Sequence, residues 1–156
     1  MQDIKIISAR YDEPTVQRLV AENMLDLSER YGGTGDDTPL AAADFVPPNG
    51  DFLVAVADGT LIASAGWRRH GDDAELKRMF TVQAARGRGL ARRMLAAVET
   101  SATAAGCRRV ILETGDKQPE AIKLYESAGY TRIPDFGYYQ GHDGVLSYAK
   151  ALPPAA

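Results

Sequence analysis

A run of arginines and glycines near the middle of the chain has the residue types that bind phosphate. Four arginines fall between positions 86 and 93, and Gly87 and Gly89 alternate with the first two. Glycine lets the backbone pass close to a ligand, and the first amides of a helix have no hydrogen-bond partner within it. Those amides, the positive end of the helix dipole and the arginines would together hold phosphate oxygens. An ordinary turn followed by a solvated helix face explains the same residues equally well.

Two common phosphate-binding motifs do not fit this run. The chain has no G-x-x-x-x-G-K-[ST] sequence, so it lacks the lysine and the hydroxyl of a P-loop nucleotidase. A dinucleotide-binding fingerprint opens a parallel βαβ unit, whereas this run follows segments that we expect to form an antiparallel meander. The run therefore suits a small polyanion other than NAD.

Composition narrows the function further. The chain has 156 residues, a net charge of −3, two histidines and a single cysteine, Cys107. Because neutralising a nucleic acid needs surplus Lys and Arg, we expect no nucleic acid partner. The shortage of cysteine and histidine excludes a disulfide framework, and we expect no metal. We also expect a cytoplasmic protein with no membrane partner, since no run of eighteen apolar residues and no apolar leader occurs.

The pattern of apolar residues predicts alternating strands and helices. We expect strands at 4–9, 52–57, 60–69, 74–82, 108–114 and 145–150, and helices at 14–30, 89–105 and 119–128. Turn residues at 58–59 and 71–73 join the second to fourth strands into an antiparallel meander. These elements predict a mixed, mainly antiparallel sheet with helices on its faces, which is an α+β domain.

The length of the chain suits one domain, which we expect over residues 1–152, with a frayed tail at 153–156. Residues 31–50 are rich in Gly, Asp and Pro, so they predict a loop with at most one helical turn, at 40–44. A loop of this length is more often functional than idle.

Two motifs in this order resemble those of the GNAT-type N-acetyltransferases. Arg86, Gly89 and Ala91 fit the family's acetyl-CoA-binding pattern [QR]-x-x-G-x-[GA]. Downstream, AIKLYESAGY at 121–130 is similar to its A-x-x-L-Y-x-x-x-G-[FY] segment. The resemblance implies a GNAT-like fold, with a sheet of six to seven strands flanked by about four helices. It also implies an enzyme that transfers acetyl groups from acetyl-CoA.

The resemblance further implies which residues contact acetyl-CoA. In that family the strand before the turn faces the pantetheine arm, and the turn with the helix start wraps the pyrophosphate. The implied contacts are Phe80, Thr81, Val82, Arg86, Gly87, Arg88, Gly89, Leu90, Ala91 and Arg92. Three positions before Ala121 the family often has an asparagine that contacts the cofactor. Gln118 stands there, and it keeps the amide with a longer reach.

Acetyl transfer to an amine needs a base for the amine and an acid for the departing thiolate. An alkyl ammonium with a pKa of about 10.4 is roughly one part in a thousand neutral near pH 7.4. Glu113 matches a strand glutamate that serves as base in ribosomal-protein alanine acetyltransferases, and Glu75 lies where other members carry one. Salt bridges explain both glutamates as well. Tyr125 matches the family tyrosine at the sulfur and can act as the acid, although core packing explains it too.

The acceptor is the part of the reaction that the sequence determines least. We expect Trp67, Arg78, Tyr138 and Tyr139 to bind it, while packing alone also explains the aromatic residues. A primary amine of a small molecule or an amino-acid-like compound is the expected substrate, because no strongly acidic run would attract a basic peptide. A protein or peptide α-amine acetyltransferase, an inactive CoA-binding sensor or interaction module, and a homodimer stay open.

Overall fold

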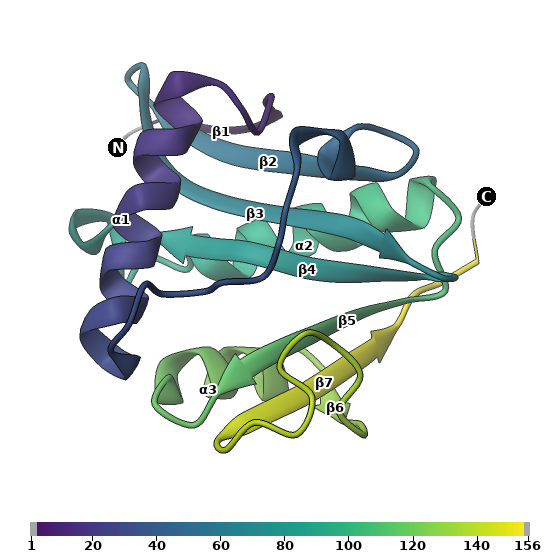
Figure 1. The fold of residues 1–156 in the computed structure, drawn as a ribbon. Helices are drawn as coiled ribbons and strands as arrows, with labels where there is room; N and C mark the ends of the chain where they lie inside the picture. Colours follow the sequence, from purple (N-terminus) through teal and green to yellow (C-terminus); the bar gives the residue numbers. More distant parts are fainter. Residues whose placement is uncertain (1–2, 155–156) are drawn as a thin grey trace.

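The computed structural model describes residues 3–154, which form a seven-stranded sheet with helices on both faces (Figure 1). The strands are β1 (Ile4–Ser8), β2 (Gly50–Ala57), β3 (Thr60–His70), β4 (Asp73–Thr81), β5 (Arg109–Gly115), β6 (Thr131–Arg132) and β7 (Val145–Ala151). The helices are α1 (Pro14–Tyr31), α2 (Leu90–Ala104) and α3 (Pro119–Ser127), with 3₁₀ turns η1 (Ala42–Phe45) and η2 (Gln83–Ala85). The strand order is β1-β2-β3-β4-β5-β7-β6, and only β4 and β5 pair in parallel.

This architecture confirms the expected α+β class and the mainly antiparallel sheet. Each expected long strand and helix lies within two residues of its observed bounds. The described residues contain three α-helices rather than about four, because the segment 32–49 forms no regular element beyond η1. Residues 153–154 carry no regular structure, and the rest of the expected tail lies outside the described residues. No helix within 3–154 is long and apolar enough to span a membrane.

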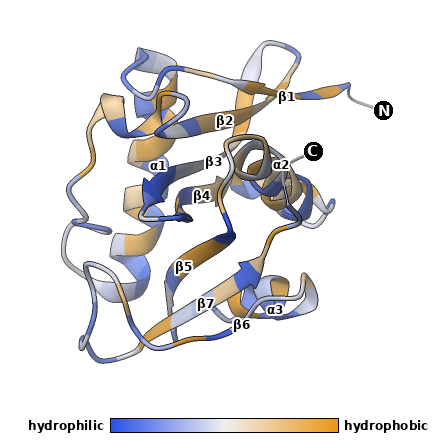
Figure 2. Ribbon diagram, turned by 90° about the vertical axis from the view of Figure 1, so that its right-hand side faces the viewer, coloured by the Kyte–Doolittle hydropathy of each residue, from blue (hydrophilic) through white to orange (hydrophobic). Residues whose placement is uncertain are grey.

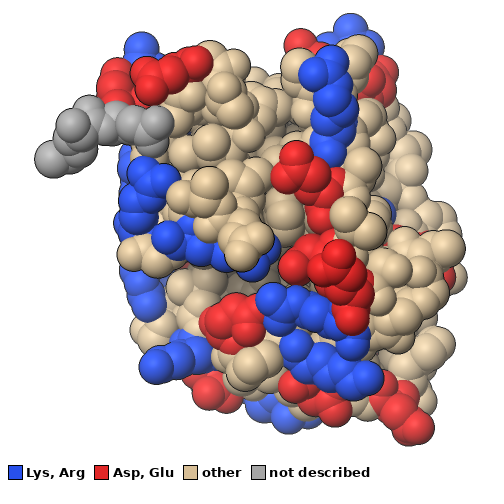
Figure 3. Space-filling view, turned by 90° about the vertical axis from the view of Figure 1, so that its left-hand side faces the viewer, with Lys and Arg blue, Asp and Glu red and all other residues tan. Residues whose placement is uncertain are grey.

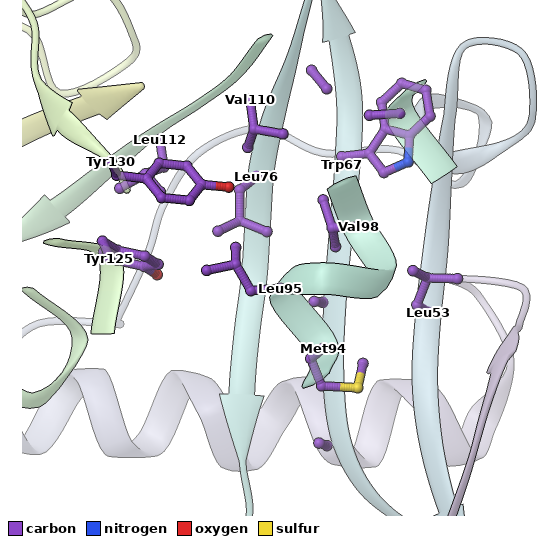
Figure 4. Close-up of a cluster of buried hydrophobic side chains, with 14 of the residues drawn as sticks. Leu53, Trp67, Leu76, Met94, Leu95, Val98, Val110, Leu112, Tyr125 and Tyr130 are labelled. Atoms are coloured by element: carbon purple, nitrogen blue, oxygen red, sulfur yellow. The ribbon is translucent and has the colours of Figure 1, made fainter. Parts of the chain in front are cut away.

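Successive apolar side chains of the central strands point to opposite faces of the sheet, so a core forms on each face. On β2, Phe52 and Val54 pack with α1 and η1, while Leu53 and Ala55 pack with α2. The larger core lies between the sheet, α2 and α3, and Figure 4 shows Trp67 beside α2 within it. Hydrophobic residues are concentrated along β2 and β5, as Figure 2 shows. These two cores fix the sheet between its covering helices.

The sheet is split between β4 and β5. The two strands pair only at Ala74–Val110 and Glu75–Ile111, near their amino ends, and they diverge toward their carboxyl ends (Figure 1). A bulge lies on β4 beside the split, where the pairing with β3 shifts by one residue and Arg78 has a φ of 57°. Figure 1 shows α1 and the loop 32–41 on one face of the sheet, and α2 on the other. The split therefore leaves an opening that these elements surround.

Candidate active site

The split between β4 and β5 leads into two cavities. The small cavity, of about 280 Å³, lies between α1, β4, β5 and the loops 32–41 and 133–144. The large groove, of about 690 Å³, lies between the end of β4, the start of α2, and α3. Asn23, Met79, Gln118 and Tyr125 line both, so the two spaces meet at these side chains. Figure 3 looks onto this end of the sheet and shows a hollow that both basic and acidic side chains border.

The start of α2 gives the large groove the features of an anion site. Gly89 is the N-cap residue, with a φ of 75°, and no side chain caps the first amides of the helix. Gly87 has a φ of 79°, and a Cβ at either glycine would meet no protein atom within 4 Å. The amides at the positive end of α2 are therefore open to a ligand in the groove.

Two of the four arginines line this groove. Arg86 donates from Nε to the Thr81 carbonyl oxygen at 2.9 Å, with its guanidinium 5.7 Å from the centre of the Phe80 ring. Arg92 donates to Ser127 Oγ at 2.6 Å. Both arginines line the same groove as the open amides, so their positive charges strengthen its attraction for phosphate.

Most of the residues implied to contact acetyl-CoA do lie along the large groove. Those that line it are Phe80, Thr81, Arg86, Gly87, Gly89, Leu90, Ala91, Arg92 and Gln118. Val82 and Arg88 lie outside the lining, and Arg88 donates to the Ala84 carbonyl oxygen at 2.9 Å. Arg93 donates to the Ile4 carbonyl oxygen at 3.4 Å, away from the groove.

A buried polar cluster forms one wall of the small cavity. Asp36 Oδ2 lies 3.3 Å from Lys77 Nζ and 2.7 Å from Arg78 Nη1, and Oδ1 accepts the Tyr139 hydroxyl at 2.7 Å. Burial alone would raise the pKa of Asp36, but Lys77, hydrogen bonds from Thr38 and Arg78 outweigh it and hold that pKa well below its ordinary value. Asp36 therefore stays ionised and ties the loop 32–41 to β4 and to Tyr139.

Glu113 lies on β5 and also lines the small cavity. Its Oε2 accepts the backbone N–H of Tyr139 at 3.1 Å, while Oε1 is buried without a partner among the described residues. Burial raises the pKa of Glu113 above its ordinary value, although the nearby Lys77 acts in the opposite direction. A Cβ at Gly137 would lie 2.5 Å from Oε1, so only glycine lets this loop pass so close to the carboxylate. A carboxylate with a raised pKa and a free oxygen suits proton abstraction.

Tyr125 stands where the small cavity and the large groove meet. Its side chain extends from α3, it is 6% exposed, and its hydroxyl lies 3.9 Å from Met79 Sδ. Burial raises the pKa of this phenol, so the hydroxyl keeps its proton. A thioether is a weak acceptor, which leaves the O–H able to donate to a group between the two cavities.

Besides Val82 and Arg88, three residues with expected site roles line neither cavity. Trp67 packs in the core and donates to Ser101 Oγ at 2.9 Å, because its face of β3 is covered by α2. Tyr138 is 49% exposed and lies outside the lining, whereas its neighbour Tyr139 lines the small cavity. Glu75 is 1% exposed and pairs with Arg68 at 3.0 Å. Trp67 therefore packs in the core, as the packing interpretation of this residue expects, and Tyr138 faces solvent outside the two cavities.

Several residues at the cavities were not anticipated from the sequence. Asp36, Lys77 and His142 line the small cavity, and Asn23 lines both spaces. Asn23 did carry a readable signal, because it is a polar residue on the apolar stripe of α1 and is 4% exposed. Asp36 carried no such signal, because the position of its loop depends on contacts with residues that are distant in sequence. Within residues 3–154, no three His, Cys, Asp or Glu side chains are grouped as metal ligands.

Comparisons with known proteins agree with this geometry. Residues 17–130 match the family described as Acetyltransferase (GNAT) family. The IAA acetyltransferase of Azospirillum brasilense is 38% identical over 94 residues, which cover 59% of this chain and 61% of that protein. The human N-acetylaspartate synthetase is 33% identical over 108 residues, which cover 68% of this chain and 36% of that protein. The matches thus span less than two thirds of these relatives.

A solved structure extends the likeness to nearly the whole chain. It is a protein of Klebsiella pneumoniae assigned as an acyl-CoA N-acyltransferase, and it superposes with a TM-score of 0.80 at 26% identity. The superposition covers 96% of this chain and 97% of that one. With the family match over residues 17–130, the split sheet and the anion site at the start of α2, the chain belongs to the acetyltransferase (GNAT) family.

Proposed function

We propose that this protein transfers an acetyl group from acetyl-CoA to a primary amine of a small molecule or an amino-acid-like compound. One observation carries the proposal: the large groove, with its anion site, meets the small cavity at Tyr125. The family match supports acetyl transfer, and the small volume of the cavity favours a small acceptor. The name of the human relative, N-acetylaspartate synthetase, supports an acceptor that resembles an amino acid.

The residues of the large groove fit coenzyme A. The open amides of α2, together with Arg86 and Arg92, offer donors to a pyrophosphate. Phe80 and Thr81 line the path from that site toward Tyr125, where a pantetheine arm would run. Acetyl-CoA supplies an acetyl group already activated as a thioester.

Glu113 and Tyr125 are assigned opposite proton transfers in this reaction. Glu113 accepts a proton from the acceptor amine, directly or through water, and so produces the neutral nitrogen. The nitrogen then forms a bond to the acetyl carbon as the carbon–sulfur bond breaks, and it loses its second proton to solvent to give the neutral amide. Tyr125 gives its proton to the departing sulfur, and exchange with solvent restores both side chains. Glu75 is the weaker choice of base, because it is held by Arg68 and lines neither cavity.

Replacing Arg92 with alanine is expected to weaken acetyl-CoA binding by about 10- to 100-fold. The physical reason is the loss of a charge-assisted contact with phosphate, worth about 1.5–3 kcal/mol. Arg93→Ala is the matched control, because Arg93 is the next residue on the same helix and points to Ile4 instead. Calorimetry at two salt concentrations measures both variants. Equal affinities for the two variants would place the phosphates elsewhere.

The proposed function is tested by free thiol release from acetyl-CoA with a panel of small amines, amino acids and peptides. The proposal expects release that depends on a small amine, together with its acetylated product by mass spectrometry. Release with peptides alone would assign the protein to peptide α-amine acetylation. Acetyl-CoA binding without release from any acceptor would contradict transfer and favour a CoA-binding sensor.

A further inference from the structure

We propose that the acceptor is an amino acid with a free carboxylate, and that Arg78 binds this carboxylate in the small cavity. The inference rests on the proposed function, and it specifies the class of acceptor that the same site takes. It follows from two buried polar atoms that have no hydrogen-bond partner among the described residues: a donor on Arg78 and an acceptor on Glu113.

Arg78 has a hydrogen-bonding edge that no described residue occupies. Its side chain is 7% exposed and lines the small cavity, with Nη1 held by Asp36 at 2.7 Å. Its Nε is buried and has no hydrogen-bond partner among residues 3–154. A guanidinium presents several donors in a fixed fork, so a group held through Nη1 leaves the edge that contains Nε for a second carboxylate. A buried donor without a partner is costly, and a bound carboxylate removes that cost.

Arg78 does not have a carboxylate to itself. Asp36 forms salt bridges with both Lys77 and Arg78. Glu75 lies 3.9 Å from Lys77, but its nearer partner is Arg68, at 3.0 Å. Arg78 therefore shares its one carboxylate with a second cation. Arg68, Lys77 and Arg78 are matched by Asp36, Glu75 and Glu113, and an amino acid, which carries one charge of each sign, would leave this balance unchanged.

The backbone at Arg78 supports a ligand-binding role. A φ of 57° is unusual for a residue other than glycine, and it occurs where the bulge on β4 interrupts pairing with β3. Bulges re-aim side chains, and strained backbone is concentrated at functional sites. Here the bulge places Arg78 and Met79 in the lining of the small cavity.

Glu113 provides the complementary end of the cavity. Its Oε1 is buried without a partner, so an ammonium group would complete its hydrogen bonding. Arg78 and Glu113 both line the cavity, and each carries one buried polar atom without a partner among residues 3–154, while Leu76, Met79 and Leu112 supply apolar lining. An amino acid has a matching carboxylate and ammonium joined by a short apolar body. Acetylation of its amine then follows the proton transfers assigned above to Glu113 and Tyr125.

The first test compares each amino acid with its own carboxamide and with the amine that lacks the carboxyl group. Thiol release is measured for all twenty L-amino acids and these matched compounds with the wild-type protein. We expect the best amino acid to exceed its carboxamide by about 10- to 100-fold in kcat/KM, as the loss of a charge-assisted contact predicts. Equal rates for the amino acid and its carboxamide would overturn the inference and leave the proposed function intact. An absence of release with every compound would contradict the proposed function itself.

The second test is Arg78→Gln, with Arg10→Gln as control. Arg10 is an exposed residue that pairs with Asp12. Arg78→Gln should raise KM for the best amino acid by about 10- to 100-fold more than it raises KM for its carboxamide. Calorimetry of that amino acid, with CoA bound, should show the same loss of affinity, and acetyl-CoA affinity reports an intact fold. An equal loss for the amino acid and the carboxamide would show that Arg78 does not read the carboxylate. If the variant does not fold, the comparison of amino acids with their carboxamides in the wild-type protein still tests the inference.

Discussion

Replacing Tyr125 with phenylalanine is expected to lower kcat by about 10²- to 10⁴-fold, the usual contribution of a general acid. Tyr125 lines both the small cavity and the large groove, and burial keeps its hydroxyl protonated. Without it, the sulfur departs as an unprotonated thiolate. Because the ring and its packing remain, acetyl-CoA affinity and KM for the acceptor should change little. Steady-state kinetics and calorimetry with acetyl-CoA measure these quantities separately.

Tyr130→Phe is the matched control for this variant. Tyr130 is also buried, with its ring centre 5.9 Å from that of Tyr125, but its hydroxyl donates to Glu99 at 2.8 Å and lines neither cavity. Its loss should cost about 1–3 kcal/mol of stability and leave kcat nearly unchanged. Full activity of Tyr125→Phe, or an equal fall in kcat in both variants, would refute the role of Tyr125 as acid.

Replacing Glu113 with glutamine is expected to lower kcat/KM near neutral pH by about 10²- to 10⁴-fold. Glu113 accepts protons only when ionised, and burial raises its pKa. The wild-type rate should therefore fall as the pH drops through that raised pKa, and this acidic limb should be absent from the variant. The variant rate should instead rise with pH as solvent deprotonates the amine. A profile of kcat/KM against pH measures both effects.

The free energy of unfolding distinguishes a loss of activity in Glu113→Gln from misfolding of the variant. A carboxyl group whose pKa is raised by folding binds its proton more tightly in the folded state, so its stabilising contribution is present at low pH and is lost as the pH rises through the folded pKa. Glutamine has no proton to lose in this range, so Glu113→Gln should be no less stable than the wild type at neutral pH. Urea unfolding at neutral pH measures the change.

Glu75→Gln is the comparison that decides between the two glutamates. It breaks a buried pair with Arg68 and should cost about 3–5 kcal/mol of stability. At temperatures where it stays folded, we expect its pH profile to keep the acidic limb. If the limb disappears from Glu75→Gln and persists in Glu113→Gln, the base is Glu75.

The elements around the anion site could be predicted because local rules determine them. Glycines and arginines at a strand-to-helix turn indicate an open helix start, and Gly87, Gly89 and Arg92 do line the large groove. The long strands and helices followed from apolar periodicity in the same way. The motif also predicted Tyr125 near the sulfur, and its position at the junction of both cavities is consistent with that prediction.

The acceptor side could not be predicted, because contacts distant in sequence create it. Asp36 meets Tyr139 across 103 positions, and neither of their loops carries a motif. The sequence left Trp67 open between packing and binding because β3 is covered on both faces, so it does not indicate which face reaches a cavity. The bulge that orients Arg78 depends on pairing between β3 and β4, which periodicity does not reveal.

Direct transfer between two bound substrates is tested most directly by initial rates over a grid of acetyl-CoA and acceptor concentrations. Because the large groove and the small cavity are separate spaces that meet at Tyr125, both substrates should bind before reaction. We predict intersecting double-reciprocal lines, with one thiol released for each acetylated amine. Parallel lines, or release of thiol without an acetylated amine, would contradict the account.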